Sequence, residues 1–130
     1  MTGMRLLPEG DTEVEMAKVM VAEQYDSIRY LLRTVLTSVG HEVVVEVNNG
    51  PDVLSTFHST LPDIVSLDLR LPSMDGFELM KHIKSTSPNT RIIAYSSGIH
   101  AVDVEMAISC GASVAFDKPF DLDDYLKHFQ

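Results

Sequence analysis

The sequence predicts an α/β fold, a doubly wound parallel sheet of five strands with five helices. Two observations carry this prediction. From Lys18 onward, short apolar runs rich in β-branched residues alternate strictly with helical patterns, and such alternation is typical of βαβ units. The chain of 130 residues with 45% hydrophobic side chains can also bury the core of one domain without disulfides or metal.

The first two strands flank an amphipathic helix. Residues 19–22 form the first predicted strand, and Gly40 ends the helix that follows it as a C-cap residue. The apolar face of this helix consists of Ile28, Leu31, Leu32, Val35, Leu36 and Val39. In residues 42–47, three valines lie on one side and two glutamates with one valine on the other, which favours a strand near the sheet edge.

The third strand is predicted to be central. Residues 48–51 are turn residues leading into a helix that has Pro51 in its first turn and stops before Pro62. Residues 63–67 carry apolar side chains on both faces, and Asp68 follows at the carboxyl end. The remaining elements are a helix at about 75–85, a strand at 91–95, a helix at about 102–110, a strand at 113–116 and a last helix with Leu122, Tyr125, Leu126 and Phe129 on one stripe.

Composition and charge restrict the setting of the protein. Residues 1–17 show neither helical nor strand periodicity and are acidic, so we predict a flexible N-terminal extension before a folded domain at 18–130. The net charge of -9 disfavours direct binding of nucleic acid. Cys110 is the single cysteine and fits a reducing, cytoplasmic setting. No apolar run approaches the roughly 20 residues that cross a bilayer, so we expect no membrane association.

Polar side chains follow four of the predicted strands. They are Glu23 and Gln24 after the first strand, Asp68 after the third, Ser96 and Ser97 after the fourth, and Asp117 and Lys118 after the fifth. In a doubly wound sheet these strand ends meet where ligands bind. Carboxylates hold Mg²⁺, an ammonium offsets phosphoryl charge, and a carboxylate can itself be the nucleophile. The pattern therefore indicates phosphoryl transfer to an aspartate.

The order and spacing of these motifs resemble the bacterial response-regulator receiver family, which includes the chemotaxis regulator. The resemblance covers residues 18–129 and rests on Lys18-Val19-Met20-Val21-Ala22-Glu23, Arg29, Pro62-Asp63-Ile64-Val65-Ser66-Leu67-Asp68, Leu71-Pro72-Ser73-Met74-Asp75-Gly76, Gly111-Ala112-Ser113 and Asp117-Lys118-Pro119-Phe120. It implies a flavodoxin-like sheet with strand order 2-1-3-4-5.

The resemblance also implies a role for each matched residue. Asp68 matches the phospho-accepting aspartate, Glu23 the first acid of the Mg²⁺ pocket, and Arg70 the residue whose main-chain carbonyl completes the metal's ligands. Ser96 matches the switch hydroxyl that moves toward the phosphoryl group, and Lys118 matches the lysine that pairs with it.

The family resemblance implies partners as well. The phosphodonor would be a sensor histidine kinase, a phosphotransfer protein or a small acyl phosphate, and the signal would pass to a downstream protein target through the surface of the fourth helix, fifth strand and fifth helix. We expect a monomer or weak dimer that is no enzyme but takes part in its own phosphorylation and dephosphorylation. The bond before Pro119 matches one that is cis in the family.

Two residues depart from the family pattern. Gln24 stands where a second acid usually binds the metal, and its amide oxygen can bind Mg²⁺ without contributing charge. One charge pair at 4 Å is worth about 4 kcal/mol at a dielectric of 20, and a third of this corresponds to roughly tenfold weaker Mg²⁺ binding. Ala115 replaces an aromatic switch residue, and Phe116 faces the opposite side of the strand.

Other readings of the same residues remain open. Each of Asp68, Glu23, Ser96 and Lys118 could be an ordinary loop or surface residue if taken alone. A pseudo-receiver that binds partners without phosphorylation would explain Gln24 and Ala115. A phosphatase of the haloacid-dehalogenase type would need Asp-x-Asp after the strand, whereas Arg70 occupies the second position here.

Overall fold

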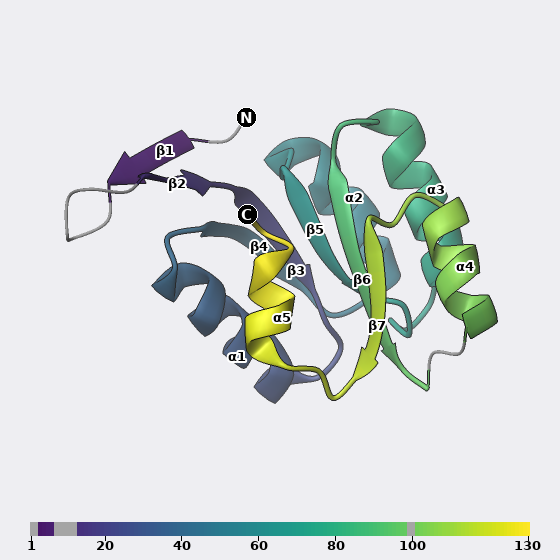
Figure 1. The fold of residues 1–130 in the computed structure, drawn as a ribbon. Coiled ribbons are helices and arrows are strands. Elements are labelled where there is room, and N and C mark those ends of the chain that lie inside the picture. Colours follow the sequence, from purple (N-terminus) through teal and green to yellow (C-terminus); the bar gives the residue numbers. More distant parts are fainter. Residues whose placement is uncertain (1–2, 7–12, 99–100) are drawn as a thin grey trace.

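The protein is a doubly wound α/β domain in the computed structural model, which describes residues 3–6, 13–98 and 101–130. Five parallel strands form the central sheet in the order β4-β3-β5-β6-β7 (Figure 1). These strands are β3 (Lys18–Ala22), β4 (Glu42–Val47), β5 (Ile64–Asp68), β6 (Arg91–Ser97) and β7 (Val114–Lys118). Counted within this sheet, the order is 2-1-3-4-5, and the predicted edge position of β4 is confirmed.

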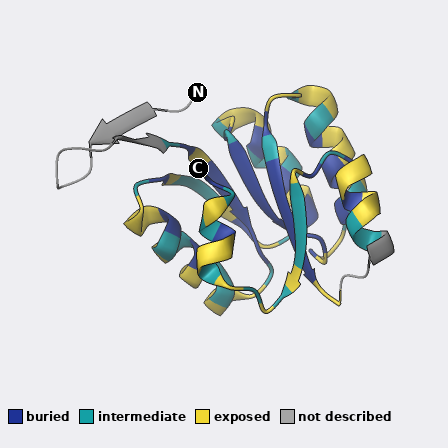
Figure 2. Ribbon diagram, viewed as in Figure 1, coloured by how far each residue is buried: buried dark blue, intermediate teal, exposed yellow. Residues whose placement is uncertain are grey.

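Helices cover both faces of the sheet and divide the core in two. They are α1 (Asp26–Ser38), α2 (Gly50–Thr60), α3 (Gly76–Thr86), α4 (Ala101–Ser109) and α5 (Leu122–Lys127). Helices α1 and α5 pack on one face through Leu32, Leu36 and Tyr125. Helices α2 and α3 pack on the other through residues such as Phe57 and Ile83. The buried residues line the sheet and the inner sides of the helices (Figure 2).

An antiparallel two-stranded sheet precedes the domain. Its strands are β1 (Gly3–Leu6) and β2 (Glu13–Met16), and the chain passes from β2 almost directly into β3. The sequence periodicity gave no sign of this pairing, because backbone hydrogen bonds between two strands require no side-chain pattern. Part of the extension at residues 1–17, namely 1–2 and 7–12, lies outside the described residues, and its flexibility stays a prediction.

Strands β6 and β7 each end two residues later than the patterns of their apolar residues indicated, and β7 also begins one residue later. The strands end later because their ends pair with each other, Ser96 opposite Asp117 and Ser97 opposite Lys118. Mutual backbone pairing extends both strands into polar sequence. Ser96 and Lys118 therefore lie on strand ends, where the sheet fixes their positions, and not in loops.

The apolar face predicted for α1 is only partly buried. Leu32 and Leu36 are buried, but Leu31 is 44% exposed and Val39 is 39% exposed. These two residues lie at the margins of the stripe that α1 turns toward the sheet.

The backbone φ of 101° at Gly40 is consistent with its predicted C-terminal capping position. Within the described residues, no helix has the length and apolarity that spanning a bilayer requires.

Candidate functional site

The carboxyl ends of β3, β5, β6 and β7 bring four of the predicted site residues to one edge of the sheet. Asp68 is the last residue of β5 and is 1% exposed. Its Oδ1 accepts a hydrogen bond from the backbone N–H of Arg70 at 2.9 Å. Its Oδ2 lies 3.4 Å from Nζ of Lys118. A buried carboxylate at this position is therefore held by one amide and one ammonium.

Lys118 bridges two carboxylates. Its Nζ lies 2.9 Å from Oε1 of Glu23 and 3.4 Å from Oδ2 of Asp68. The ammonium also lies over the rings of Tyr25 and Tyr95, at 5.1 and 5.4 Å from their centroids. Buried charges persist when they are paired and further hydrogen-bonded. The lysine thus joins the two acids and two aromatic rings in one cluster.

Glu23 is fully buried, so it is not an acid on the solvent-exposed surface. Its Oε1 accepts a hydrogen bond from the Tyr95 hydroxyl at 3.0 Å in addition to the Lys118 contact. Its Oε2 accepts one from the backbone N–H of Tyr25 at 2.8 Å. Burial raises the pKa of Tyr95 well above its ordinary value, and the charge of Glu23 adds to this rise. Tyr95 therefore stays protonated and donates.

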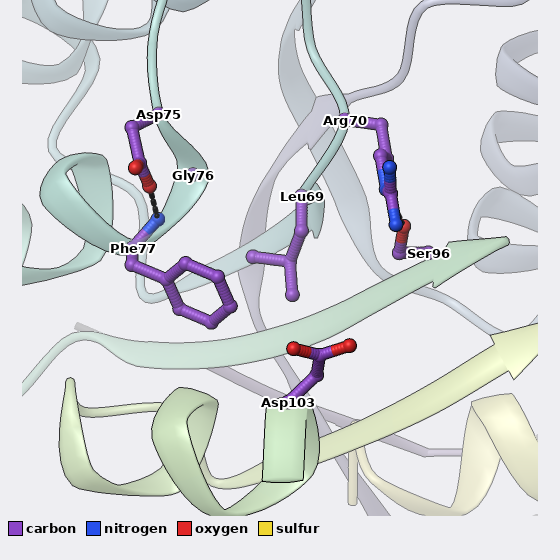
Figure 3. A pocket seen from close by; sticks show the side chains of 7 residues that line it. All are labelled: Leu69, Arg70, Asp75, Gly76, Phe77, Ser96 and Asp103. Carbon is purple, nitrogen blue, oxygen red and sulfur yellow. Dashed lines mark hydrogen bonds between the residues drawn. The ribbon is translucent and has the colours of Figure 1, made fainter. Parts of the chain in front are cut away.

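Gln24 and Arg70 meet at the outer side of the site. The Gln24 side-chain amide donates to the main-chain carbonyl of Arg70 at 3.1 Å. The Arg70 side chain points the other way, and its Nε donates to the Ser96 hydroxyl at 3.0 Å. Figure 3 shows Arg70 and Ser96 next to each other on one side of a pocket that Phe77 and Asp103 also line. This pocket has a volume of about 230 Å³. The predicted switch hydroxyl is thus held by a guanidinium.

The site offers Mg²⁺ a set of hard oxygen ligands. Asp68 supplies a carboxylate and Arg70 its carbonyl, while Glu23 adds a second negative charge. Among the described residues, no group of three or more His, Cys, Asp or Glu side chains could hold a metal ion, which is consistent with an amide at Gln24. The Gln24 amide lies 3.1 Å from the Arg70 carbonyl, and both residues line the same pocket as Asp68. Rotation of the Gln24 amide would present its oxygen there, so the residues fit the ion.

The sequence reading missed Tyr95 and Tyr25 as members of the site. Tyr95 lies on β6 just before Ser96, within the core that faces α1 and α5, and only its hydroxyl reaches Glu23.

Ala115 packs in the opposite core, whereas Phe116 faces the same side as Tyr95. The Phe120 ring centroid lies 5.1 Å from those of both Phe116 and Tyr95, and the Phe120 ring is stacked on Phe116 and tilted against Tyr95. The Lys118–Pro119 peptide bond is cis.

Two buried carboxylates and a lysine thus lie at the strand ends of a doubly wound sheet, which is where ligands bind in sheets of this class. A family model described as the response regulator receiver domain matches residues 19–130. The chain therefore belongs to the response regulator receiver domain family.

Individual relatives agree with this assignment. The chain is 34% identical over 104 residues to the chemotaxis protein CheY of Thermotoga maritima, and the aligned region covers 79% of this chain and 86% of that relative. It is 31% identical over 107 residues to sporulation initiation phosphotransferase F of Bacillus subtilis, covering 82% of this chain and 86% of the relative. The signal receiver domain of the response regulator NarL from Mycobacterium tuberculosis is similar in structure, with a TM-score of 0.80 at 26% identity over 88% of this chain and 93% of that chain.

Proposed function

We propose that this receiver domain accepts a phosphoryl group on Asp68 and signals through the change that follows. The observation that carries the proposal is the position of Asp68, buried at the end of β5 with an oxygen 3.4 Å from the Lys118 ammonium. A polar pocket of about 200 Å³ adjoins this carboxylate, and Gln24, Arg70 and Ser97 also line it. The pocket gives a phosphoryl group access to the nucleophile.

Mg²⁺ would be held by Glu23, Asp68 and the Arg70 carbonyl, because each carboxylate oxygen keeps a lone pair beyond the hydrogen bond that it accepts. Rotation of the Gln24 amide would add a neutral oxygen to these ligands. Bound Mg²⁺ would supply positive charge against the phosphoryl oxygens. Gln24 brings no charge to this set. We therefore expect Mg²⁺ to bind more weakly than it would beside a second acid.

The transfer step needs only the residues already described. An oxygen of Asp68 forms the new bond to phosphorus, the bond from phosphorus to the donor breaks, and the electron pair leaves with the donor. The Lys118 ammonium offsets the charge gained by the acyl phosphate. Hydrolysis restores the carboxylate, so the chain takes part in both its phosphorylation and its dephosphorylation. A sensor histidine kinase, a phosphotransfer protein or an acyl phosphate would be the donor.

The switch would use Ser96 and Lys118. The Arg70 guanidinium holds the Ser96 hydroxyl before phosphorylation, and the added negative charge would attract that hydroxyl and the lysine. Both residues lie where β6 leads toward α4 and β7 leads into α5. The α4-β7-α5 surface would then change its affinity for a downstream protein target in the cytoplasm, with the chain acting as a monomer or weak dimer and without direct contact to nucleic acid.

The test is the intact mass of the protein after incubation with acetyl phosphate and Mg²⁺. We expect one added phosphoryl group, and none in Asp68→Asn, which keeps the shape of the side chain but lacks the nucleophilic carboxylate. Asp117→Asn is the matched control, because Asp117 is exposed and adjoins Lys118; it should still be phosphorylated. Absence of added mass at every Mg²⁺ concentration, with a kinase donor as well, would contradict the proposal.

A phosphorylation-independent pseudo-receiver is the second candidate function. It is favoured by Lys118 lying closer to Glu23 than to Asp68, at 2.9 against 3.4 Å, and by the absence of an aromatic side chain at Ala115. Such a protein would bind its downstream target equally well as wild type and as Asp68→Asn, with or without a phosphodonor. A donor-dependent change in that affinity, lost in Asp68→Asn, would exclude this alternative.

A further inference from the structure

An apolar groove lies beside the phosphorylation pocket. It has a volume of about 520 Å³ and runs between the first turns of α1 and the segment that follows β7. Its apolar walls include Ile28 and Leu31 from α1, and Pro119, Phe120 and Leu122 from the other side. Among these, Leu31 is 44% exposed to solvent although it is apolar. An apolar concavity with a few polar groups at one end is the usual form of a small-molecule site.

The groove and the phosphorylation pocket share a wall. Tyr25, Ser97 and Lys118 line both, and the Lys118 ammonium lies 5.1 Å from the Tyr25 ring centroid. The two pockets are therefore adjacent, and a molecule with a phosphoryl group beside Asp68 would meet the edge of the groove at Tyr25, Ser97 and Lys118. The shared ammonium would contact the anionic end of such a molecule, which is the charge complementarity that the site offers.

We propose that the groove binds the apolar acyl group of an acyl phosphate donor, and thereby selects donors with an aromatic or branched body over acetyl phosphate. This inference rests on the proposed phosphorylation of Asp68. The Asp68 oxygen bonds to phosphorus while the bond from phosphorus to the acyl oxygen breaks, and the electron pair leaves on a free carboxylate. No proton or further reactant is needed, and the total charge is unchanged.

The net charge of -9 also favours a donor with an uncharged body. A donor whose body carries a further negative charge would be repelled by the protein's overall field. An uncharged apolar body has no such penalty and removes apolar surface of the groove from water. Among small acyl phosphates, those with an uncharged apolar body are therefore the class that both the groove and the charge favour.

The experiment compares benzoyl phosphate with acetyl phosphate on the full chain with Mg²⁺, using intact mass to follow phosphorylation. The measured quantity is the donor concentration that gives half the maximal rate, because the maximal rates also reflect the different chemical reactivity of the two donors. We expect this concentration to be about tenfold lower for benzoyl phosphate, since a phenyl ring buries far more apolar surface than a methyl group.

A matched pair of variants on α1 locates the contact. Leu31→Ser should bring the ratio of the two half-saturation concentrations close to one, whereas Tyr30→Ser should leave the ratio as in wild type, because Tyr30 is 62% exposed and does not line the groove. Equal half-saturation concentrations in wild type would overturn the inference while the proposed function stands, and so would a preference that survives in Leu31→Ser. Failure of both donors and of a kinase donor would instead contradict the proposed function itself.

Discussion

Gln24 is the residue at which this site departs most from the acidic pattern that Mg²⁺ sites favour. Its amide contacts the Arg70 carbonyl at 3.1 Å and adds no charge to the carboxylates of Glu23 and Asp68. The missing charge could be predicted from the sequence, because the resemblance to the receiver family implies a second acid at the position of Gln24. It did not predict that both oxygens of Glu23 would already accept hydrogen bonds, since Tyr95 is distant in sequence and belongs to no motif.

Replacing the amide of Gln24 with a carboxylate tests this reading. We expect Gln24→Asp to tighten Mg²⁺ binding about tenfold, because a third of a charge interaction of about 4 kcal/mol survives desolvation. The binding can be followed through chemical shifts of backbone amides around Asp68 during a Mg²⁺ titration. Gln24→Asn shortens the side chain equally without adding charge and should not gain affinity. Equal affinities of the two variants would show that the charge of this residue is not what limits binding.

The buried tyrosines predict how stability depends on pH. Burial raises the pKa of Tyr95 and of Tyr125 well above the ordinary value of 10.0. A raised pKa favours the neutral form in the folded state, so this contribution to stability is complete below pH 10 and is lost as the pH rises through the folded values.

Urea unfolding at a series of pH values measures this dependence. We expect the free energy of unfolding to decline more steeply above about pH 10 in wild type than in Tyr95→Phe/Tyr125→Phe, because the variant has lost the two raised pKa values. Lysine titration contributes equally to both proteins and cancels in the comparison. Identical slopes would mean that these hydroxyls ionise as readily in the folded protein as in the unfolded chain.

At the scale of elements, the strands and helices were predictable wherever side-chain patterns determine them. The alternation of apolar runs gave all five strands of the sheet. The apolar pattern ended too early at β6 and β7, because the last two residues of each strand are polar. Ser96 pairs with Asp117 and Ser97 with Lys118 through the backbone, and an apolar pattern cannot predict such pairing. The β1-β2 pair escaped notice for the same reason. Leu31 was placed on the buried face, but it borders the groove instead.

A buried hydrogen bond joins the central strand to the last helix. The Ser66 hydroxyl on β5 lies 2.7 Å from the Tyr125 hydroxyl on α5, and both side chains are fully buried. Among the described residues, no buried side-chain nitrogen or oxygen lacks a hydrogen-bond partner. This bond ties α5 to the strand that ends in Asp68.

Removing one partner should cost more than removing both. We expect Ser66→Ala to lower the free energy of unfolding by about 1–3 kcal/mol, because it leaves the Tyr125 hydroxyl buried and unpaired. Adding Tyr125→Phe should restore part of that loss, as a double-mutant cycle in urea would reveal. If the losses of the two single variants simply add, the hydroxyls do not interact in solution.

At the scale of the whole molecule, the two cores differ in kind. The core between the sheet, α1 and α5 is aromatic, with Tyr95, Phe120 and Tyr125 in contact through ring centroids 5.1 and 5.3 Å apart. The core under α2, α3 and α4 is mainly aliphatic and holds Ala115. The topology that brings four strand ends together could be predicted from sequence. Which side chains turn toward the acids could not, because that depends on the packing of each core.

The most direct test of the central claim is the identity of the residue that carries the phosphoryl group. Borohydride reduces an acyl phosphate of aspartate to homoserine, so the phosphorylated protein should yield a peptide in which position 68 reads as homoserine, while protein treated without a phosphodonor retains Asp68. Homoserine at position 68 would establish that residue as the acceptor. Phosphorylated protein with homoserine at another position, or with none, would contradict the account.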